Sequence, residues 1–570
     1  MTFTALIRTL AIALPLACAH PALHAAPAAG FKLDHEGLVL NDVQGRPAQR
    51  LALRAKHLDT RTLGHGPNAT LLAVMLDADS SQPVVVSAPA TAAASAPPLQ
   101  PWPQAPQTKL SIETLCLHLD AQGLPNLFLI AEDGRAEQWL LRPQGSLLLR
   151  HVALPIQAGD CVADDERAML LVAEPALGVW AYDIGAEGSV ARQPLALRHP
   201  WGTLDFAPHR LQLQGTHLKV SAKDGKKKAE QSIKLPAGAR PATLPIVLPR
   251  QQTAPVARLG DAADDPAIWV HPERPGDSRV LATNKKQGLL VYDLQGAQTQ
   301  LLESGRLNNV DLRQRIRVGN GWRDLAVATQ RDEKAIVLFE IDAKGVVAEL
   351  ARLPSGLDDL YGICAARNRE DGLDVFANDK DGRFVHLRLT VKVAAGGRLD
   401  WHADRLRSFR LASQPEGCVV DEPNERLFVG EEDRGIWALS SRGDVAPKLE
   451  LVLPVGPLLK ADVEGLAVYR GQRASWLVAS SQGNDSYVVI DALPPFTPRG
   501  AFRIGLSAAA GIDGASETDG LDVTSATLGA DYPQGLLVVQ DGHKRLPDGP
   551  QNFKYVSWQD VMDALRLVDR

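Results

Sequence analysis

Acidic residues beside glycine or in acidic pairs recur in the second half of this 570-residue chain. They stand in short segments with the character of turns, at Asp264-Asp265-Pro266, Glu416-Gly417, Glu431-Glu432, Asp462-Val463-Glu464-Gly465, Asp513-Gly514 and Glu517-Thr518-Asp519-Gly520. Hard divalent cations such as Ca²⁺ take about six to eight oxygen ligands, and carboxylates on turns can supply them without rigid geometry. The pattern therefore indicates a site for several calcium ions, against the simpler alternative that Asp-Gly turns only connect strands.

Asp462 and Glu464 carry more weight than the other acidic residues. They are two positions apart in the sequence. Alternation along a β-strand places such residues on the same face. We therefore expect a paired-carboxylate arrangement at this point.

Cationic residues are interleaved with these acids in the same half. They are Lys285, Lys286, Arg306, Arg331 and Lys380. A cavity that combines metal-binding carboxylates with Arg and Lys suits a ligand with many phosphates, because the cations bind phosphate oxygens and metal ions bridge them. The alternative for each cation is solvated surface charge. The sequence contains no P-loop, no His-Glu-x-x-His zinc helix and no Gly-x-Ser-x-Gly nucleophile elbow.

Composition excludes several classes of protein. Hydrophobic residues make up 45% and charged residues 22%, which is typical of globular proteins and excludes wholesale disorder. Lys and Arg number 61 against 67 Asp and Glu, so the formal charge is −6 and no global basic field is available. We therefore expect no nucleic-acid partner. The length favours at least two domains, since a typical domain has about 150 residues.

The N-terminus has the pattern of a secretory signal peptide over residues 1–25. Arg8 precedes an apolar run over 9–19, and small residues follow it. This run is too short to span a membrane, which takes about 20 residues, and no later window supplies a transmembrane segment. Cys18 leaves lipidation open as an alternative. We expect an exported protein, periplasmic or extracellular, that is a monomer.

The chain contains an internal duplication. The stretch from Gly159 to Trp180 resembles the stretch from Glu416 to Trp437 at a constant offset of 257. Two further pairs of stretches match in the same order at offsets of 248 to 251. We therefore expect two related halves, near residues 30–245 and 250–570.

Short β-rich runs that end in turns fill the halves, for example 289–294, 335–341, 427–429, 476–479 and 535–540. Many short strands with Gly and Asp turns indicate an all-β fold, and the length of each half is too great for a simple sandwich of about 100 residues. A β-propeller of roughly six four-stranded blades fits this pattern. The helical signal is weak except over 558–568.

A series of motifs in fixed order runs from about residue 261 to the C-terminus. They are Asp264-Asp-Pro-Ala-Ile-Trp-Val-His-Pro272, Thr283-Asn-Lys-Lys-Gln-Gly-Leu289, Arg306-Leu-Asn-Asn-Val-Asp311, Tyr361-Gly362, Gln414-Pro-Glu-Gly417, Glu431-Glu432, Asp462-Val-Glu-Gly465, Ser480-Ser-Gln-Gly-Asn-Asp-Ser-Tyr487 and Thr518-Asp-Gly-Leu-Asp522. On these motifs the chain resembles the β-propeller phytases, the alkaline, calcium-dependent 3-phytase family, in a tandem two-domain form. The resemblance implies a six-bladed propeller with calcium ions in a channel at one end. It also implies hydrolysis of phytate (myo-inositol hexakisphosphate), which arrives as a calcium complex, and of other inositol phosphates.

The resemblance assigns roles to residues at matching positions. Those that look like calcium ligands of the catalytic cluster are Glu416, Glu432, Asp462, Glu464, Asp513 and Asp519, and those that look like ligands of a structural calcium are Asp264 and Asp265. Those that look like phosphate-binding groups are Lys285, Lys286, Arg331, Tyr361 and Lys380, with Asn308, Asp311 and Gln482 nearby. Clustered Ca²⁺ would lower the pKa of a bridging water, and the resulting hydroxide would attack phosphorus directly, without a covalent enzyme intermediate.

One departure from the family pattern lies before the Asp-Asp-Pro motif. Relatives carry Glu-Thr there, whereas this chain has Gln252-Thr253. We expect one calcium site, a structural one, to be weakened, and the enzyme to be active.

The first half lacks the groups that carry the chemistry. At the positions of Glu416, Glu432 and Lys380 it has Gly159, Pro175 and Glu132. We therefore expect a degenerate, incomplete propeller-like domain over 30–245 that is non-catalytic, and a catalytic propeller over 250–570.

Four cysteines follow the signal peptide, which permits three disulfide connectivities in an oxidising compartment. Because the cysteines follow the duplication, we expect Cys116 to pair with Cys161 and Cys364 with Cys418.

Two other functions stay open. The protein could be a calcium-dependent phosphatase for other polyphosphorylated small molecules, or a non-catalytic exported propeller that binds a partner. The combination of Asp462 and Glu464 with Lys285 and Arg331 favours catalysis over binding.

Overall fold

The computed structural model describes residues 29–91, 99–185, 191–223, 229–236, 244–393 and 399–569. The predicted signal peptide (1–25) and Cys18 lie outside the described residues. Within them the regular secondary structure is nearly all β-strand, and the α-helix α1 (Trp558–Leu565) falls inside the segment predicted to be helical. No helix in the described part of the chain has the length and apolar character that a membrane span requires.

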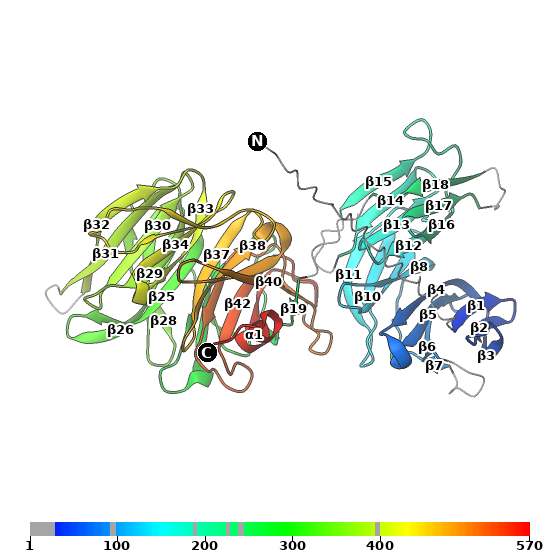
Figure 1. The fold of residues 1–570 in the computed structure, drawn as a ribbon, viewed down its shortest axis with the longest axis horizontal. Coiled ribbons are helices and arrows are strands. Elements are labelled where there is room, and N and C mark those ends of the chain that lie inside the picture. The colour runs from blue at the N-terminus through cyan, green and yellow to red at the C-terminus, as the bar shows by residue number, and fades with distance from the viewer. Residues whose placement is uncertain are drawn as a thin grey trace, which may run out of the picture.

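The described residues of the second half form six sheets (Figure 1). In chain order these are β21 (Ala263–Trp269), β22 (Arg279–Asn284), β23 (Gly288–Tyr292) and β24 (Gln298–Leu302); β25 (Leu307–Val318), β26 (Gly321–Gln330), β27 (Ala335–Ile341) and β28 (Val347–Pro354); β29 (Leu360–Arg367), β30 (Leu373–Asp379), β31 (Arg383–Val393) and β32 (Leu399–Arg410); β33 (Pro415–Asp421), β34 (Arg426–Glu431), β35 (Gly435–Ser440) and β36 (Glu450–Pro454); β37 (Val463–Arg470), β38 (Ser475–Ser481), β39 (Ser486–Asp491) and β40 (Pro498–Ile504), joined by β19 (Ile246–Val247); and β41 (Leu521–Thr524), β42 (Leu536–Asp541) and β43 (Asn552–Ser557), joined by β20 (Gln251–Gln252).

These sheets close into a ring. The first strand of each sheet contacts the first strand of the next, from β21 through β25, β29, β33 and β37 to β41, and β41 contacts β21. The beginning of the second half completes its last sheet, since β20 pairs antiparallel with β43. The predicted all-β propeller fold is confirmed.

Apolar packing between neighbouring sheets holds the ring together. The innermost strands β21 and β33 are buried along their whole length. One core cluster joins Ile268 of β21 to Val538 and Tyr555 of the last sheet. Each large apolar side chain buried in this way contributes about 1.5–3 kcal/mol. The innermost strands are therefore a rigid frame for the residues at their ends.

The described residues of the first half form five sheets, drawn in blue to green in Figure 1. They are β1 (Gly30–Asp34), β2 (Gly37–Asn41) and β3 (Pro47–Ala52); β4 (Ala55–Leu63), β5 (Thr70–Asp77), β6 (Pro83–Pro89) and β7 (Gln100–Pro101); β8 (Ile112–Leu119), β9 (Pro125–Ala131), β10 (Arg135–Leu140) and β11 (Leu147–Ala153); β12 (Asp160–Asp164), β13 (Met169–Glu174), β14 (Gly178–Asp183) and β15 (Arg192–Leu197); and β16 (Arg210–Gln214), β17 (His217–Ser221) and β18 (Glu230–Lys234). The strands β1, β4, β8, β12 and β16 contact one another in that order.

Two disulfides occupy equivalent places in the two halves. Cys116 of β8 is bonded to Cys161 of β12, and Cys364 of β29 to Cys418 of β33. The Cα–Cα distances are 6.1 and 5.6 Å. Each bond joins the innermost strands of neighbouring sheets, and the predicted pairing is confirmed.

Loss of the second disulfide is expected to destabilise the ring. The Cys364→Ala/Cys418→Ala variant should unfold at lower urea concentration, with a loss of about 2–4 kcal/mol, because the bond closes a long loop and restricts the unfolded chain. Equilibrium unfolding of both proteins without a reductant measures the difference. An unchanged midpoint and slope would contradict the prediction.

Candidate active site

One polar side chain stands at the start of each innermost strand of the second half. The six residues are Asp264 (β21), Asn308 (β25), Tyr361 (β29), Glu416 (β33), Glu464 (β37) and Asp519, which lies two residues before β41. In the first five of these strands the register with the next strand shifts at this position. A β-bulge of this kind leaves a residue out of the ladder and redirects its side chain. The same β-bulge therefore recurs around the ring. The six side chains come together at one end of the channel.

Glycine follows four of these six residues because the innermost strands approach closely there. A Cβ atom on Gly417 would lie 2.2 Å from the carbonyl oxygen of Glu464, and one on Gly465 would lie 2.6 Å from the amide nitrogen of Leu521. Neither position has room for a side chain. The recurrent acid-glycine pairs of the sequence are thus a packing requirement as well as a chemical one.

Three carboxylates form the centre of the site. Oxygens of Glu416, Glu432 and Glu464 lie within 4.8 Å of one another, and this is the one such group of three in the described part of the chain. Glu416 accepts hydrogen bonds from Asn308 Nδ2 (3.1 Å) and from the Tyr361 hydroxyl (2.9 Å). Burial, with the charge of Glu416 added, raises the pKa of Glu464 well above its ordinary value.

Glu432 of this group and the neighbouring Asp462 show the same crowding of negative charge. Burial raises the pKa of Glu432 to about 7, although Gln414 donates a hydrogen bond of 2.6 Å to it. Burial also raises the pKa of Asp462, with contributions from Asp433 and Glu416. A positive charge placed among these carboxylates would offset their mutual repulsion and lower their pKa values.

Lys285 links two of the six channel residues. Its Nζ lies 2.8 Å from Asp519, 3.0 Å from Asp261 and 3.8 Å from Asp264. Burial disfavours the charged amine, but the carboxylates of Asp264 and Asp519 more than offset burial, so the pKa of Lys285 is raised. Asp519 also accepts a hydrogen bond of 2.6 Å from Gln482, and burial raises its pKa to about 6.

Buried carboxylate oxygens without hydrogen bonds fit a metal ion. Both side-chain oxygens of Asp264 are buried and lack a hydrogen-bond partner, as is Oε2 of Glu464. Asp265 is different, because it accepts a hydrogen bond of 3.1 Å from the amide of Val310. Leaving a buried polar group unpaired costs about 1–3 kcal/mol. Hard oxygen donors that no protein group satisfies suit a hard divalent cation.

Two cations lie against the ring of Tyr361. Lys380 Nζ is 4.2 Å and Arg331 Cζ is 5.5 Å from the ring centroid. Arg331 also donates a hydrogen bond of 3.5 Å to Asn308 Oδ1. Lys286 is exposed, with its ammonium bonded to the carbonyl oxygen of Leu259 at 2.7 Å. Positive charge therefore borders the carboxylates on several sides.

Two predicted site residues lie away from this group. Asp311 is bonded to Arg313 (2.6 Å) and to the amide of Ala365 (2.8 Å), on a part of β25 that lines a small cavity of about 70 Å³ in the channel. Asp513 is bonded at 2.7 Å to the ammonium of Lys554, which is fully buried. Asp462 precedes β37 and is partly exposed, while Glu464 points into the carboxylate group.

Asp261, Gln414 and Lys554 bond to predicted site residues and were not predicted to have a role. Asp261 bonds to Lys285, Gln414 to Glu432 and Lys554 to Asp513. Gln414 stands in the Gln414–Gly417 motif, and its place in this motif could have indicated a role in the site. Neither of the other two stands in a pattern that marks it.

Buried carboxylates bordered by lysine and arginine at the end of a propeller channel suit the binding of phosphate esters. The family model described as Phytase matches residues 235–569. The 3-phytase of Bacillus subtilis (strain 168) is 36% identical over 327 residues, which cover 55% of this chain and 84% of that protein. The chain belongs to the phytase family and is a phosphoric monoester hydrolase.

Solved structures give weaker likenesses. Saccharomyces cerevisiae Sqt1 aligns with 65% of this chain and 94% of its own, at 10% identity and a TM-score of 0.26. The β-propeller domain of Myceliophteria thermophila Cps50 (Swd1) aligns with 70% of this chain and 96% of its own, at 12% identity and a TM-score of 0.31.

Proposed function

We propose that this protein is a calcium-dependent phytase that hydrolyses phosphate monoesters of phytate and of other inositol phosphates. The observation that carries the proposal is the group formed by Glu416, Glu432 and Glu464, which stands beside the cations on Tyr361. The name of the 36% identical relative supports the substrate. Membership of a hydrolase family decides against a non-catalytic binding module.

The carboxylates would hold calcium. Glu416, Glu432, Glu464, Asp462 and Asp519 offer hard oxygen donors, and the unpaired Oε2 of Glu464 fits this role. Calcium held here supplies positive charge that acidifies a bound water and neutralises phosphate oxygens. Asp264, with both oxygens unpaired, would bind the same type of ion at the neighbouring position.

The protein's own side chains would hold the substrate and direct the attack. Lys380 and Arg331 would bind oxygens of the phosphate under attack, and Lys285 those of a neighbouring phosphate. Because burial raises the pKa of Tyr361, its hydroxyl stays protonated and keeps its hydrogen bond to Glu416. Water is therefore the proposed nucleophile: its oxygen bonds to phosphorus while the bond from phosphorus to the inositol oxygen breaks and that oxygen takes a proton.

Phosphate release from phytate, in EDTA and with added Ca²⁺, tests the proposal. We expect release only with calcium, and its loss in Asp462→Ala. Folded protein that releases no phosphate at any calcium concentration would refute the proposal. Faster release from a different polyphosphorylated small molecule would replace phytate with that substrate.

Calcium-free protein is expected to lose stability as the pH rises from about 4 to about 7. The pKa values of Glu432 (about 7) and Asp519 (about 6) lie above those of the unfolded chain, near 4. The folded state thus binds these protons more tightly, so the stability they contribute is complete below about pH 4 and is lost as the pH passes 6 to 7.

Calcium should reverse this loss, because it competes with the same protons. Urea unfolding in EDTA and in Ca²⁺ at pH 5 and pH 7.5 measures both effects. A calcium stabilisation as large at pH 5 as at pH 7.5 would contradict this account.

We also propose that residues 30–245 form a non-catalytic domain beside the catalytic domain over 250–570. Gly159, Pro175 and Glu132, which align with Glu416, Glu432 and Lys380, line a cavity of about 610 Å³ in the first half. At these three positions the first half therefore lacks the two carboxylates and the lysine of the second half.

Export through residues 1–25 is part of the same proposal. The two disulfides support it, because such bonds persist in oxidising compartments. N-terminal sequencing of protein recovered from outside the cytoplasm should start close to residue 26.

A further inference from the structure

The two halves of the chain share an apolar core beside the sheet that closes the ring. Leu140 and Leu149 of the first half are buried in one cluster with Leu506 and Leu546 of the second. Leu546 lies in the connection between β42 and β43 of the ring-closing sheet. Burial of apolar side chains from both sides stabilises such a contact.

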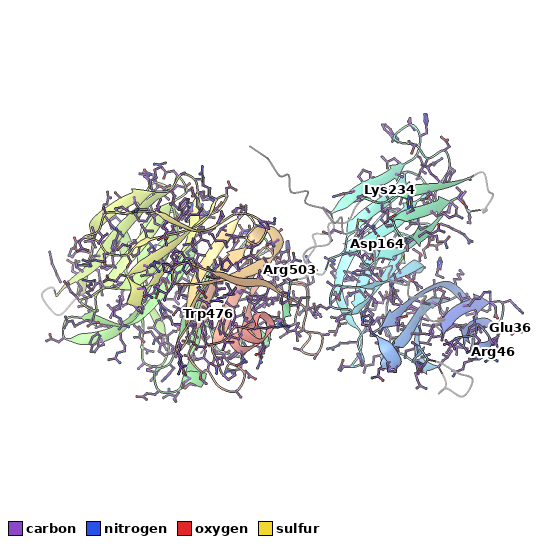
Figure 2. The ribbon with its side chains drawn as sticks, viewed as in Figure 1. Glu36, Arg46, Asp164, Lys234, Trp476 and Arg503 are labelled. Carbon is purple, nitrogen blue, oxygen red and sulfur yellow. A yellow bond between two sulfur atoms is a disulfide. The ribbon has the colours of Figure 1, made fainter. Side chains whose placement is uncertain are left out.

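Hydrogen bonds lie beside this apolar core. The Gln122 side-chain amide donates to the carbonyl oxygen of Leu506 (3.0 Å) and accepts from the amide nitrogen of Leu506 (2.9 Å). Arg142 donates to the carbonyl oxygen of Ala508 at 2.6 Å. Figure 2 labels Arg503 at the side of the second half that faces the first. A buried apolar centre with polar bonds at its border is typical of a specific interface.

A buried cation lies close to this contact. The ammonium of Lys554 is fully buried and contacts carboxylate oxygens of Asp513 (2.7 Å) and Asp541 (2.9 Å). It also contacts Gln252 Oε1 (3.0 Å) and Asn552 Oδ1 (2.9 Å). We call these five residues the Lys554 centre. Because β20 and β43 supply three of them, the centre lies where the ring closes.

The first half covers the Asp513 side of the Lys554 centre. Asp513 and Arg545 line a cavity of about 20 Å³, and residues of the first half, among them Asp120, Leu149 and Arg150, line the same cavity. A cavity of this size has room for about one water molecule. Asp513 is only 2% exposed. The first half is therefore part of what separates Asp513 from bulk water.

Residues 545 and 546 connect the contact to the Lys554 centre. The side chain of Leu546 packs against the first half, while its carbonyl oxygen accepts a hydrogen bond of 3.1 Å from Gln252 Nε2. The amide of Arg545 donates a hydrogen bond to Asp513. Loosening of the contact at Leu546 would therefore reach two members of the centre.

We propose that the first half is a stabilising domain that covers the ring-closing sheet: it buries Leu506 and Leu546 and keeps water from the Lys554 centre. The apolar burial stabilises the second half directly. Exclusion of water strengthens the attraction between the ammonium and its carboxylates, which is weaker where solvent reaches the pair. This role goes beyond the proposed hydrolysis and requires neither calcium nor substrate.

The test compares full-length Gln122→Ala/Leu149→Ala, the contact variant, with the wild type in EDTA by hydrogen exchange. Both substitutions leave the sequence of the second half intact. They remove the two hydrogen bonds to Leu506 and widen the cavity beside Asp513. We expect amides of β43 and of residues 541–546 to exchange about tenfold faster, because local opening becomes easier. Exchange in β29, three sheets away around the ring, should not change.

Lys554→Met supplies the second readout. In the wild type its carboxylates would be left in a site that the first half shields, whereas water admitted in the contact variant would hydrate them. The fall in urea midpoint that Lys554→Met causes, followed by exchange of β43 in increasing urea, should therefore be about half as large in the contact variant.

The matched control is Leu211→Ala/Gln212→Ala, which removes the same residue types from the first half away from the contact. Leu211 is 9% exposed, against 7% for Leu149, and packs in a cluster of first-half residues. The control should change neither the exchange of β43 nor the effect of Lys554→Met.

Unchanged exchange of β43 in the contact variant would overturn the proposal. An equal effect of Lys554→Met in the contact variant and in the wild type would also overturn it. If the contact variant does not fold, Gln122→Ala alone gives the same two readouts. Neither readout involves catalysis, so a protein that releases no phosphate would refute the proposed phytase activity and leave this test intact.

Discussion

Glu416→Gln is expected to lower phosphate release from phytate by about 10³-fold. Glu416 lies at the centre of the carboxylate group and accepts hydrogen bonds from both Asn308 and Tyr361. Glutamine has one acceptor oxygen and a donor amide, so one of these two donors would face another donor. The substitution also removes a negative charge from a site where charge stabilises the reaction, and such losses typically cost about 10²- to 10³-fold.

A stability measurement separates this effect from misfolding. Removal of a charge from a crowded carboxylate group relieves repulsion with Glu464, whose pKa the charge of Glu416 helps to raise. Glu416→Gln should therefore unfold at higher urea concentration than the wild type in EDTA, and should gain less from calcium. The control is Glu349→Gln on the outer strand β28, where Glu349 bonds to Arg352 and Ser304. A variant with wild-type activity would exclude Glu416 from the site.

Acidic turn motifs together with the family resemblance made much of the site predictable. The same residue position at the start of six innermost strands carries Asp264, Asn308, Tyr361, Glu416, Glu464 and Asp519, and all six were candidates from the sequence. The pattern is readable because a glycine or a second polar residue follows each of them. Close approach of the innermost strands imposes that feature, so it survives in the sequence as a motif.

The partners of Asp311 and Asp513 were not predicted from the sequence motifs. Asp311 is three residues after Asn308, and the bulge between them turns its side chain to Arg313. Asp513 pairs with Lys554, 41 residues away, across the last sheet. For Asp513 the deciding partner is a cation far away in the sequence, so its distance depends on the fold and not on local sequence.

Lys554→Met is expected to cost about 3–5 kcal/mol of folding free energy at pH 7. The ammonium of Lys554 is fully buried, 2.7 Å from Asp513 and 2.9 Å from Asp541. Burial lowers the pKa of Lys554, but Asp541 and Asp513 more than offset burial, so that the amine stays charged. Removal of this partner leaves two buried carboxylates without the ammonium that both contact, which is strongly destabilising.

Urea unfolding in EDTA measures this loss. The control is Lys344→Met, at an exposed turn, which should change stability by less than about 0.5 kcal/mol. The loss in Lys554→Met should shrink toward pH 4, because burial raises the pKa of Asp513 and its protonation removes part of the uncompensated charge. Addition of Asp513→Asn to the variant should recover part of the loss at pH 7. A variant as stable as the wild type at pH 7 would contradict the assignment of Lys554 as the counter-charge.

The response of Lys554→Met to Ca²⁺ tests whether the Lys554 ammonium occupies a position that a metal ion could bind. Besides the two carboxylates, its ammonium contacts Gln252 Oε1 (3.0 Å) and Asn552 Oδ1 (2.9 Å), so four residues direct oxygens at one buried cation. The neutral Gln252 suits a single positive charge, where a glutamate would add a third negative one. Lys554→Met opens this oxygen set, and Ca²⁺ should then raise the unfolding midpoint of the variant more than that of the wild type. An equal rise in both proteins would mean that the oxygens are shaped for an ammonium alone, and that this part of the propeller is stabilised independently of calcium.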